Sequence, residues 1–249
     1  MVDYFRYRFN NDTCTACIRV NISFIITMII CQLYTPEIED YASISVKNIS
    51  EYCDANGYVH HALRDVRSFN RHPSWNRVPF LLDTMKMCDD NEWLCWIDVD
   101  ILAMDFSKRI DSFCNNDYNM VLSCQGRGFA FGYHFEHCLN FGLFFLRNTE
   151  WSSKLLKGLW LWTQGDYEKY RHEKYWDNDA VNFFWKKNIN SFDKNVYIDY
   201  NPRNFNSFYE KDLGLGGKYE IGDPICHFTD MSSEDRMNLM KEFSKKVVK

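Results

Sequence analysis

Apolar residues in the first hundred positions gather in short runs that alternate with amphipathic segments. The Ile-rich run over residues 22–31 predicts a first central strand that is buried on both faces. Residues 42–56 predict a helix that Gly57 ends, before a short strand over 58–62. This alternation predicts parallel βαβ units, with ligand-binding residues at the carboxyl ends of the strands.

A second helix is predicted after His72-Pro73-Ser74, a sequence typical of a helix start. From Trp75 onward, apolar residues recur at helical spacing until the acidic break at 89–91. The short apolar run Trp93–Ile97 then follows, bounded by acidic residues on both sides. This profile predicts an interior strand of a parallel-type sheet.

The pattern in the second half of the chain is less regular. Strand-like apolar stretches lie at 120–124 and 139–147, with a Gly-rich segment, predicted as a loop, at 125–133. Helices are predicted over 151–163, 177–187 and 232–248, the last with Ser233 near its cap. Residues 203–217, rich in Asn, Gly and aromatics, predict a further loop.

The composition fits one α/β domain. The 249 residues contain 46% hydrophobic and 25% charged residues, which predicts a packed core rather than disorder. No repeat or linker divides the chain, so a polar arm over 1–20 and a single domain over 21–249 are expected. A net charge of −5 without a basic stripe argues against a nucleic-acid partner.

Cysteine usage and hydropathy predict a soluble, cytoplasmic protein. The ten cysteines lack the regular spacing of a disulfide framework, and Cys14 and Cys17 form a CxxC without a second pair at zinc spacing. The apolar segment 18–33 is interrupted by polar residues and is shorter than the roughly 20 residues that span a bilayer. It also lies too far from the start for a secretory signal, so no integral membrane segment is expected.

Asp98-Val99-Asp100 follows the apolar run and is the leading candidate for chemistry. Where the chain turns off the sheet, two carboxylates one residue apart can converge on one cation. A divalent ion held there could bind a diphosphate. The tripeptide alone is a weak signal, because a solvated strand end gives the same pattern.

Three further segments strengthen this signal through their order and spacing. They are residues 72–79, residues 140–148 followed by Trp151-Ser152, and residues 222–228. With Asp98-Val99-Asp100, this ordered set resembles the family 34 glycosyltransferases over most of the chain. The resemblance implies a GT-A fold, a Rossmann-like mixed α/β sheet flanked by helices in a single domain.

The same resemblance implies an activity and its partners. The expected reaction is the retaining, Mn²⁺- or Mg²⁺-dependent transfer of a hexose or pentose from a nucleoside-diphosphate sugar. A UDP-sugar is expected over a GDP-sugar, and the acceptor is expected to be a glycan or glycoprotein. The membrane anchor and stem of the family's Golgi members are missing here, which favours a cytosolic enzyme of a microbe or a large DNA virus.

The resemblance also assigns residues to the metal site. Asp98 and Asp100 match the family's metal-binding acids, and His227 matches its histidine ligand. An imidazole beside two carboxylates is reasonable chemistry for Mn²⁺. A lone histidine in an apolar context is more often a core residue, so the assignment of His227 depends on the whole set.

Further residues are expected around the donor. Asn140 and Gly142 match the family's Asn-x-Gly near the donor sugar, with an ordinary turn as the alternative. Arg77 stands where a lysine is usual, and its different geometry predicts a rearranged contact. Two more residues, Thr27 and Met28, would line the nucleoside pocket from the end of the first strand, and Val99 would contact the donor between the two acids.

Asp177 is the expected carboxylate near the anomeric carbon, and with Asn140 it is the catalytic candidate. Helix capping explains an Asp at this position equally well. One departure concerns the diphosphate, because residues 229–232 contain no lysine where the family carries a basic residue. Lys218 or Arg236 is the expected substitute.

Two other classes of protein remain open at this point. A haloacid-dehalogenase-like phosphohydrolase also places DxD after an apolar strand, but on its first strand, whereas a strand–helix pair precedes Asp98 here. A glycan-binding module without catalysis would use the aromatic residues, which make up 17% of the chain. Retained metal ligands argue against such a module.

Overall fold

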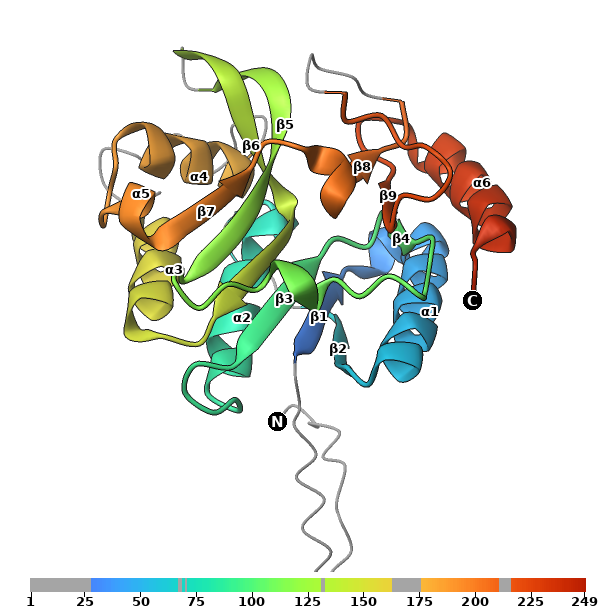
Figure 1. Ribbon diagram of the computed structural model, residues 1–249, viewed down its shortest axis with the longest axis horizontal. Coiled ribbons are helices and arrows are strands. Elements are labelled where there is room, and N and C mark those ends of the chain that lie inside the picture. Colours follow the sequence, from blue (N-terminus) through green and yellow to red (C-terminus); the bar gives the residue numbers. More distant parts are fainter. Residues whose placement is uncertain (1–27, 67–68, 70, 131–132, 163–175, 211–215) are drawn as a thin grey trace, which may run out of the picture.

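A six-stranded mixed sheet in the order β2-β1-β3-β6-β5-β7 forms the centre of the computed structural model (Figure 1). The structure describes residues 28–66, 69, 71–130, 133–162, 176–210 and 216–249. The strands of this sheet are β1 (Ile29–Tyr34), β2 (Val59–Arg64), β3 (Trp93–Ile97), β5 (Met120–Ala130), β6 (Tyr133–Arg147) and β7 (Val196–Asp199). Strand β1 runs parallel to β2 and β3, while β6 runs antiparallel to β3 and β5.

A smaller sheet, in the order β4-β9-β8, lies beside the carboxyl ends of the central strands. Its strands are β4 (Ile101–Ala103), β8 (Ser207–Phe208) and β9 (Ile225–His227). Strand β4 follows β3 after three residues and pairs with β9 so that Ile101 lies opposite His227. This pairing brings the end of the chain beside the end of β3.

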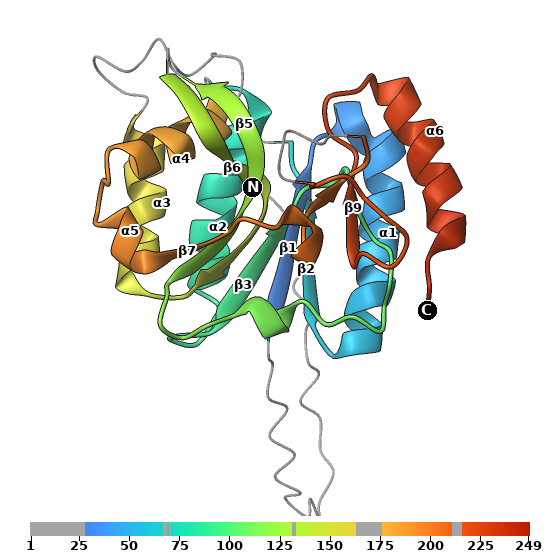
Figure 2. The same ribbon diagram turned by 45° about the horizontal axis from the view of Figure 1, so that its top comes forward.

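Helices cover both faces of the central sheet (Figures 1 and 2). On one side lie α2 (Arg77–Met85), α3 (Glu150–Trp162), α4 (Trp176–Lys186) and α5 (Phe192–Asn195). On the other lie α1 (Glu39–Asn56) and α6 (Ser233–Phe243), together with the smaller sheet. The 3-10 helices are η1 (Pro36–Ile38), η2 (Pro73–Asn76), η3 (Asp111–Phe113), η5 (Pro202–Asn204) and η6 (Ser244–Lys246). The expected single α/β domain is confirmed.

Strand β3 shows why an unbroken apolar run is needed at this place. All five of its residues are buried. Leu94 and Trp96 pack with the core of α2, α3 and α4, whereas Trp93, Cys95 and Ile97 pack with the core on the α1 side. A strand covered on both faces has no solvent-facing position, so the usual alternation of apolar and polar residues disappears.

The predicted helix boundaries in the first hundred residues are largely confirmed. Gly57 ends α1 in the left-handed conformation, at φ 72°, and its N–H donates to the carbonyl of Cys53. His72 caps η2, because its side chain accepts the N–H of Ser74, and Pro73 occupies the first turn. The chain then continues directly into α2.

Four boundary predictions require correction. The first strand ends at Tyr34 rather than residue 31, because parallel pairing with β2 continues to that residue. Residues 125–130 belong to β5 and not to a loop, because Gly126 and Gly128 are accommodated by irregular pairing with β6. The segment 203–217 contains η5 and β8, the latter held by β9. The last helix is capped by Ser232 and ends at Phe243.

The predicted N-terminal arm over 1–20 and the CxxC of Cys14 and Cys17 lie outside the described residues. Among the helices that the structure describes, none combines the length and apolar character needed to cross a membrane.

Candidate functional site

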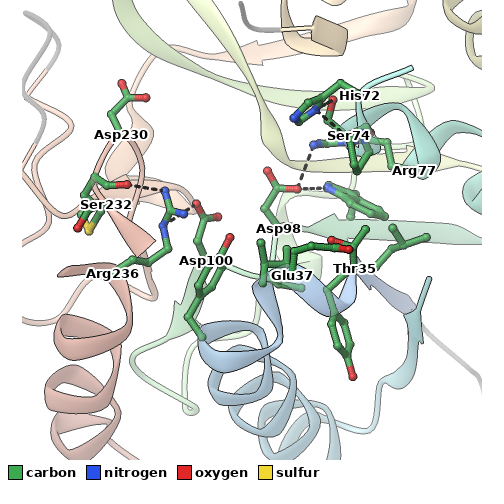
Figure 3. A pocket seen from close by; sticks show the side chains of 18 residues that line it. Thr35, Glu37, His72, Ser74, Arg77, Asp98, Asp100, Asp230, Ser232 and Arg236 are labelled. Carbon is green, nitrogen blue, oxygen red and sulfur yellow. Dashed lines mark hydrogen bonds and ion pairs between the residues drawn. The ribbon is translucent and has the colours of Figure 1, made fainter. Parts of the chain in front are cut away.

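A cavity of about 840 Å³ opens at the carboxyl ends of β1 and β3, beside η2 and the start of α6 (Figure 3). Its volume lies within the range of small-molecule sites. The polar and charged residues of its wall that Figure 3 labels are Thr35, Glu37, His72, Ser74, Arg77, Asp98, Asp100, Asp230, Ser232 and Arg236. The cavity therefore presents both carboxylates and guanidinium groups to a ligand.

Asp98 continues the alternation of β3 and points to the same side as Trp96. The indole Nε1 of Trp96 donates to Asp98 Oδ1 at 2.7 Å, and an Arg77 nitrogen lies 3.3 Å from the same oxygen. The Asp98 N–H donates to the Gly142 carbonyl at 2.8 Å, which fixes the backbone. Burial raises the pKa of Asp98, and the positive charge of Arg77 opposes that shift.

Asp100 lies where the chain turns from β3 into β4, and it faces the opposite wall. His227 Nε2 is 3.1 Å from Asp100 Oδ1, and Arg236 Nε is 3.5 Å from Oδ2. The Phe228 N–H donates to the Asp100 carbonyl at 2.9 Å, which ties this turn to β9. Burial acts to raise the pKa of Asp100, but His227 and Arg236 outweigh it, so the pKa is lowered.

Asp98, Asp100 and His227 together form a donor set that fits a divalent metal. One ligand atom from each lies within 4.8 Å of the others. Oxygen and nitrogen ligands about 2.1 Å from a metal, on neighbouring corners of an octahedron, lie about 3 Å apart. The 3.1 Å between Asp100 Oδ1 and His227 Nε2 matches that spacing. Two carboxylates and one imidazole suit Mn²⁺ or Mg²⁺ more than a thiolate-seeking ion.

Gly142 leaves the space that this donor set needs. A Cβ at this position would lie 2.5 Å from His227 Cε1, 2.9 Å from Asp98 Oδ2 and 3.0 Å from Asn140 Oδ1. Any larger residue would therefore displace two of the three candidate ligands. The Asn-x-Gly segment noted in the sequence is at the site for this steric reason.

Arg77 lies between two carboxylates and is itself only 8% exposed. Its Nε is 2.7 Å from Asp177 Oδ2, and its Nη1 donates to the Phe141 carbonyl at 2.5 Å. The guanidinium also packs over the Trp96 ring at 4.9 Å. Burial raises the pKa of Asp177 to about 6, against the effect of Arg77. Figure 3 shows Arg77 beside Asp98, with Asp100 and Arg236 across the pocket.

The structure brings most of the predicted site residues together. Arg77, Asp98, Val99 and Asp100 line the cavity, and His227 lies against Asp100. A second group lies just behind the wall, where Asn140 and Gly142 contact one another and Asp177 is 2% exposed behind Arg77.

Met28 is in the wrong place for the predicted nucleoside contact, and Thr27 lies outside the described residues. Met28 precedes β1 and is buried in the core on the α1 side. Six strand residues separate it from the carboxyl end, or roughly 20 Å. The prediction failed because the strand runs further than its Ile-rich part, and the cavity instead meets Leu33, Tyr34 and Thr35.

The two cations expected near a diphosphate have different positions. Arg236, from α6, lines the cavity and packs over the Tyr41 ring at 4.9 Å. Its Nε donates to the Phe228 carbonyl at 2.9 Å, which holds the guanidinium beside Asp100. Lys218 is exposed and is not among the cavity-lining residues.

Sequence reasoning missed Tyr41 and Asn206. Tyr41 begins the amphipathic pattern of α1 and resembles any other core residue of a helix. Asn206 lies in the segment predicted as a loop, yet it is fully buried and contacts His227. A buried Asn is difficult to recognise from sequence, because its hydrogen-bond partners come from β5, β6 and β9.

The chain matches the model of the galactosyl transferase GMA12/MNN10 family over residues 21–124. It is 22% identical over 209 residues to a probable alpha-1,6-mannosyltransferase, MNN10, of Saccharomyces cerevisiae, covering 68% of this chain and 52% of that protein. It is 34% identical over 86 residues to an alpha-1,2-galactosyltransferase of Schizosaccharomyces pombe, covering 32% of this chain and 20% of that protein. The chain therefore spans about half the length of the first relative and less of the second.

Solved structures share the fold. A glycosyltransferase involved in glycosylating the major capsid of PBCV-1 aligns with a TM-score of 0.66 at 14% identity, over 86% of this chain and 98% of that one. The galactosyltransferase LgtC, in complex with donor and acceptor sugar analogs, aligns with a TM-score of 0.56 at 13% identity, over 89% of this chain and 97% of that one. The expected GT-A fold is confirmed.

Proposed function

We propose that this chain, which matches the model of the galactosyl transferase GMA12/MNN10 family over residues 21–124, is a glycosyltransferase of that family that catalyses a metal-dependent, retaining sugar transfer. The proposed donor is a nucleoside-diphosphate sugar that carries a hexose or pentose. The proposed acceptor is a hydroxyl group of a glycan. Retention of the anomeric configuration is taken from the family resemblance.

One observation supports this proposal above the others. Asp98 and Asp100 line the cavity at the carboxyl end of β3, and His227, from a distant segment, lies against Asp100. That end of an open α/β sheet is where such folds bind ligands. A divalent cation held by these three residues would neutralise a bound diphosphate and stabilise it as a leaving group.

The chain's own cations support binding of the same diphosphate. Arg236 lies at the cavity wall, 3.5 Å from Asp100, in place of the basic residue missing from 229–232. Guanidinium groups bind phosphate oxygens through paired N–H donors. Arg77 stands on the other side, where Asp98, Asp177 and the Phe141 carbonyl hold its orientation. We assign Asp177 to positioning Arg77, because its carboxylate is shielded from the cavity.

In the proposed transfer, the bond between the anomeric carbon and the diphosphate oxygen breaks, and its electron pair leaves with the diphosphate. The acceptor oxygen bonds to the same carbon on the same face. Its proton passes to the departing diphosphate oxygen, so charge and atoms balance. The cavity wall contributes by holding the two substrates in contact and excluding water.

The phosphohydrolase alternative gains no support. The reported matches are to glycosyltransferases. In addition, β1, α1, β2 and α2 all precede the acidic pair of Asp98 and Asp100, so the pair does not follow the first strand.

The proposal is tested by thermal shift and slow donor hydrolysis, with Mn²⁺ and a panel of UDP- and GDP-sugars. We expect stabilisation by one nucleotide class, lost in Asp100→Ala and retained in the control Asp117→Ala. Asp117 is an exposed aspartate in a turn next to Asn116, which bonds the Trp93 side chain at the opposite end of β3 from Asp98. Phosphate release from simple phosphomonoesters, together with indifference to nucleotides, would refute the proposal. The panel also tests the expected preference for UDP.

A further inference from the structure

A buried network of four polar side chains lies behind the candidate metal site. It consists of Ser123, Asn140, Asn206 and His227, each of which is less than 9% exposed. Asn206 is its centre, because its side chain contacts the other three at 3.0 Å each. The residues come from β5, β6, the segment before β8, and β9.

A backbone group determines the orientation of the amides in this network. The Gly142 N–H can only donate, and it lies 2.9 Å from Asn140 Oδ1. That oxygen also lies 3.0 Å from Asn206, so the facing Asn206 atom must be the amide nitrogen. The Asn140 nitrogen is bonded to Gln125 Oε1 at 3.0 Å, which agrees with this orientation.

The orientation of Asn206 then fixes the tautomer of His227. The Asn206 nitrogen uses its two N–H groups on Asn140 and Ser123 Oγ. Its oxygen is left facing His227 Nδ1 at 3.0 Å. An amide oxygen cannot donate, so the proton between them belongs to Nδ1. In the neutral imidazole, Nε2 then carries the lone pair.

We propose that Asn206 is a positioning residue that holds His227 in the Nδ1–H tautomer, with Nε2 bare and aimed at a divalent cation beside Asp100. The inference rests on the proposed metal dependence. It also gives the Asn-x-Gly segment a role behind the site, since Asn140 orients Asn206 instead of contacting the donor sugar.

The contact between His227 and Asp100 agrees with this role. Without a proton or cation between them, the Nε2 lone pair and the Asp100 carboxylate would be two acceptors only 3.1 Å apart. A divalent cation bonded to both satisfies them together. Groups that orient ligating histidines in this way commonly change metal affinity by about 10–100-fold when removed.

The first experiment measures Mn²⁺ binding to the whole chain by calorimetry. Asn206→Leu has a similar volume but cannot accept from Nδ1–H, so we expect affinity to fall by about 10–100-fold. Asn206→Asp keeps an oxygen that can accept from Nδ1–H, although it adds a charge and loses the donors to Asn140 and Ser123. Its affinity should therefore stay within roughly tenfold of wild type. If Asn206 served only to keep the chain folded, both substitutions would weaken Mn²⁺ binding to a similar degree.

Asn48→Leu is the matched control. Asn48 is also a buried amide, bonded to both backbone groups of Ala103 on the α1 side. The Asn48→Leu substitution should lower the melting temperature without changing the Mn²⁺ affinity. Equal Mn²⁺ affinities for wild type and Asn206→Leu would overturn the inference while leaving the proposed function intact. A wild-type chain that does not bind Mn²⁺ would overturn both.

The second experiment reads the tautomer in the wild-type chain and uses a variant only to assign the signal. Imidazole ¹⁵N spectra of the metal-free wild type, with His227 assigned by its loss in His227→Gln, report the tautomer directly. We expect a protonated Nδ1, because it faces the Asn206 oxygen. An Nδ1 without a proton would overturn the inference.

Discussion

Replacing Gly142 with alanine adds one methyl group at the point where the candidate metal ligands converge. The backbone φ of Gly142 is not in the left-handed region, so an alanine can adopt the same conformation. The substitution also keeps the N–H that donates to Asn140 Oδ1. Its effect therefore comes from contact alone, with His227 Cε1 at 2.5 Å and Asp98 Oδ2 at 2.9 Å from the new Cβ.

The size of the effect follows from these distances. Ordinary carbon–carbon contact begins near 3.4 Å, so the His227 ring must move by about 0.9 Å. Metal–ligand distances tolerate only about 0.2 Å, so we expect loss of the His227 ligand and at least a tenfold fall in Mn²⁺ affinity. Overpacking costs roughly 1–3 kcal/mol of unfolding free energy. For a chain of this size, that corresponds to a fall of about 2–12 °C in Tm.

Calorimetry with Mn²⁺ and thermal unfolding of the metal-free chain would measure the two effects. Gly158→Ala, in helix α3, is the control, because its Cβ would meet Phe184 at 3.3 Å and Asn190 Nδ2 at 3.8 Å and none of the candidate ligands. It should leave Mn²⁺ affinity unchanged, with a stability change of at most about 1 kcal/mol. Wild-type Mn²⁺ affinity in Gly142→Ala would refute the placement of His227 and Asp98 around this glycine.

Three further predictions concern stability, each measured by urea unfolding. Arg77→Met leaves the Asp98 and Asp177 carboxylates without their cation and should cost about 3–5 kcal/mol; a loss below 1 kcal/mol would contradict the described ion pairs. Burial raises the pKa of Asp177 to about 6, so wild type should gain stability relative to Asp177→Asn as pH falls from about 7 to about 4, by at most roughly 3 kcal/mol. A difference in unfolding free energy that does not change with pH would contradict this. Gly57→Ala should cost about 1 kcal/mol because φ is 72° with open space around the Cβ, and Gly57→Asn should cost less.

The sequence predicted those parts of the fold that depend on local pattern. The buried strand β3 follows from five consecutive apolar residues, and the end of α1 follows from Gly57. The acidic pair of Asp98 and Asp100 was predicted at the carboxyl end of a strand, and the structure places it directly after β3. These predictions succeeded because each depends on residues within a few positions of one another.

The β5–β6 hairpin and Met28 show where local pattern was insufficient. Glycines at 126 and 128 indicate a loop by composition, yet pairing between β5 and β6 holds them in a sheet. Met28 lies in an Ile-rich run whose end does not coincide with the end of β1. In both places, pairing with a neighbouring strand decided the structure, and composition does not encode that partner.

The sequence by itself determined the identity of Asp98, Asp100 and His227 and their order among the family's segments. Only the tertiary structure decided that His227 meets Asp100, through the pairing of β4 with β9, and that Arg77 lies between Asp98 and Asp177. It alone also revealed Asn206 behind the histidine. The physical reason is that hydrophobic periodicity records how each segment is buried, whereas the candidate ligand set depends on contacts between segments more than a hundred residues apart.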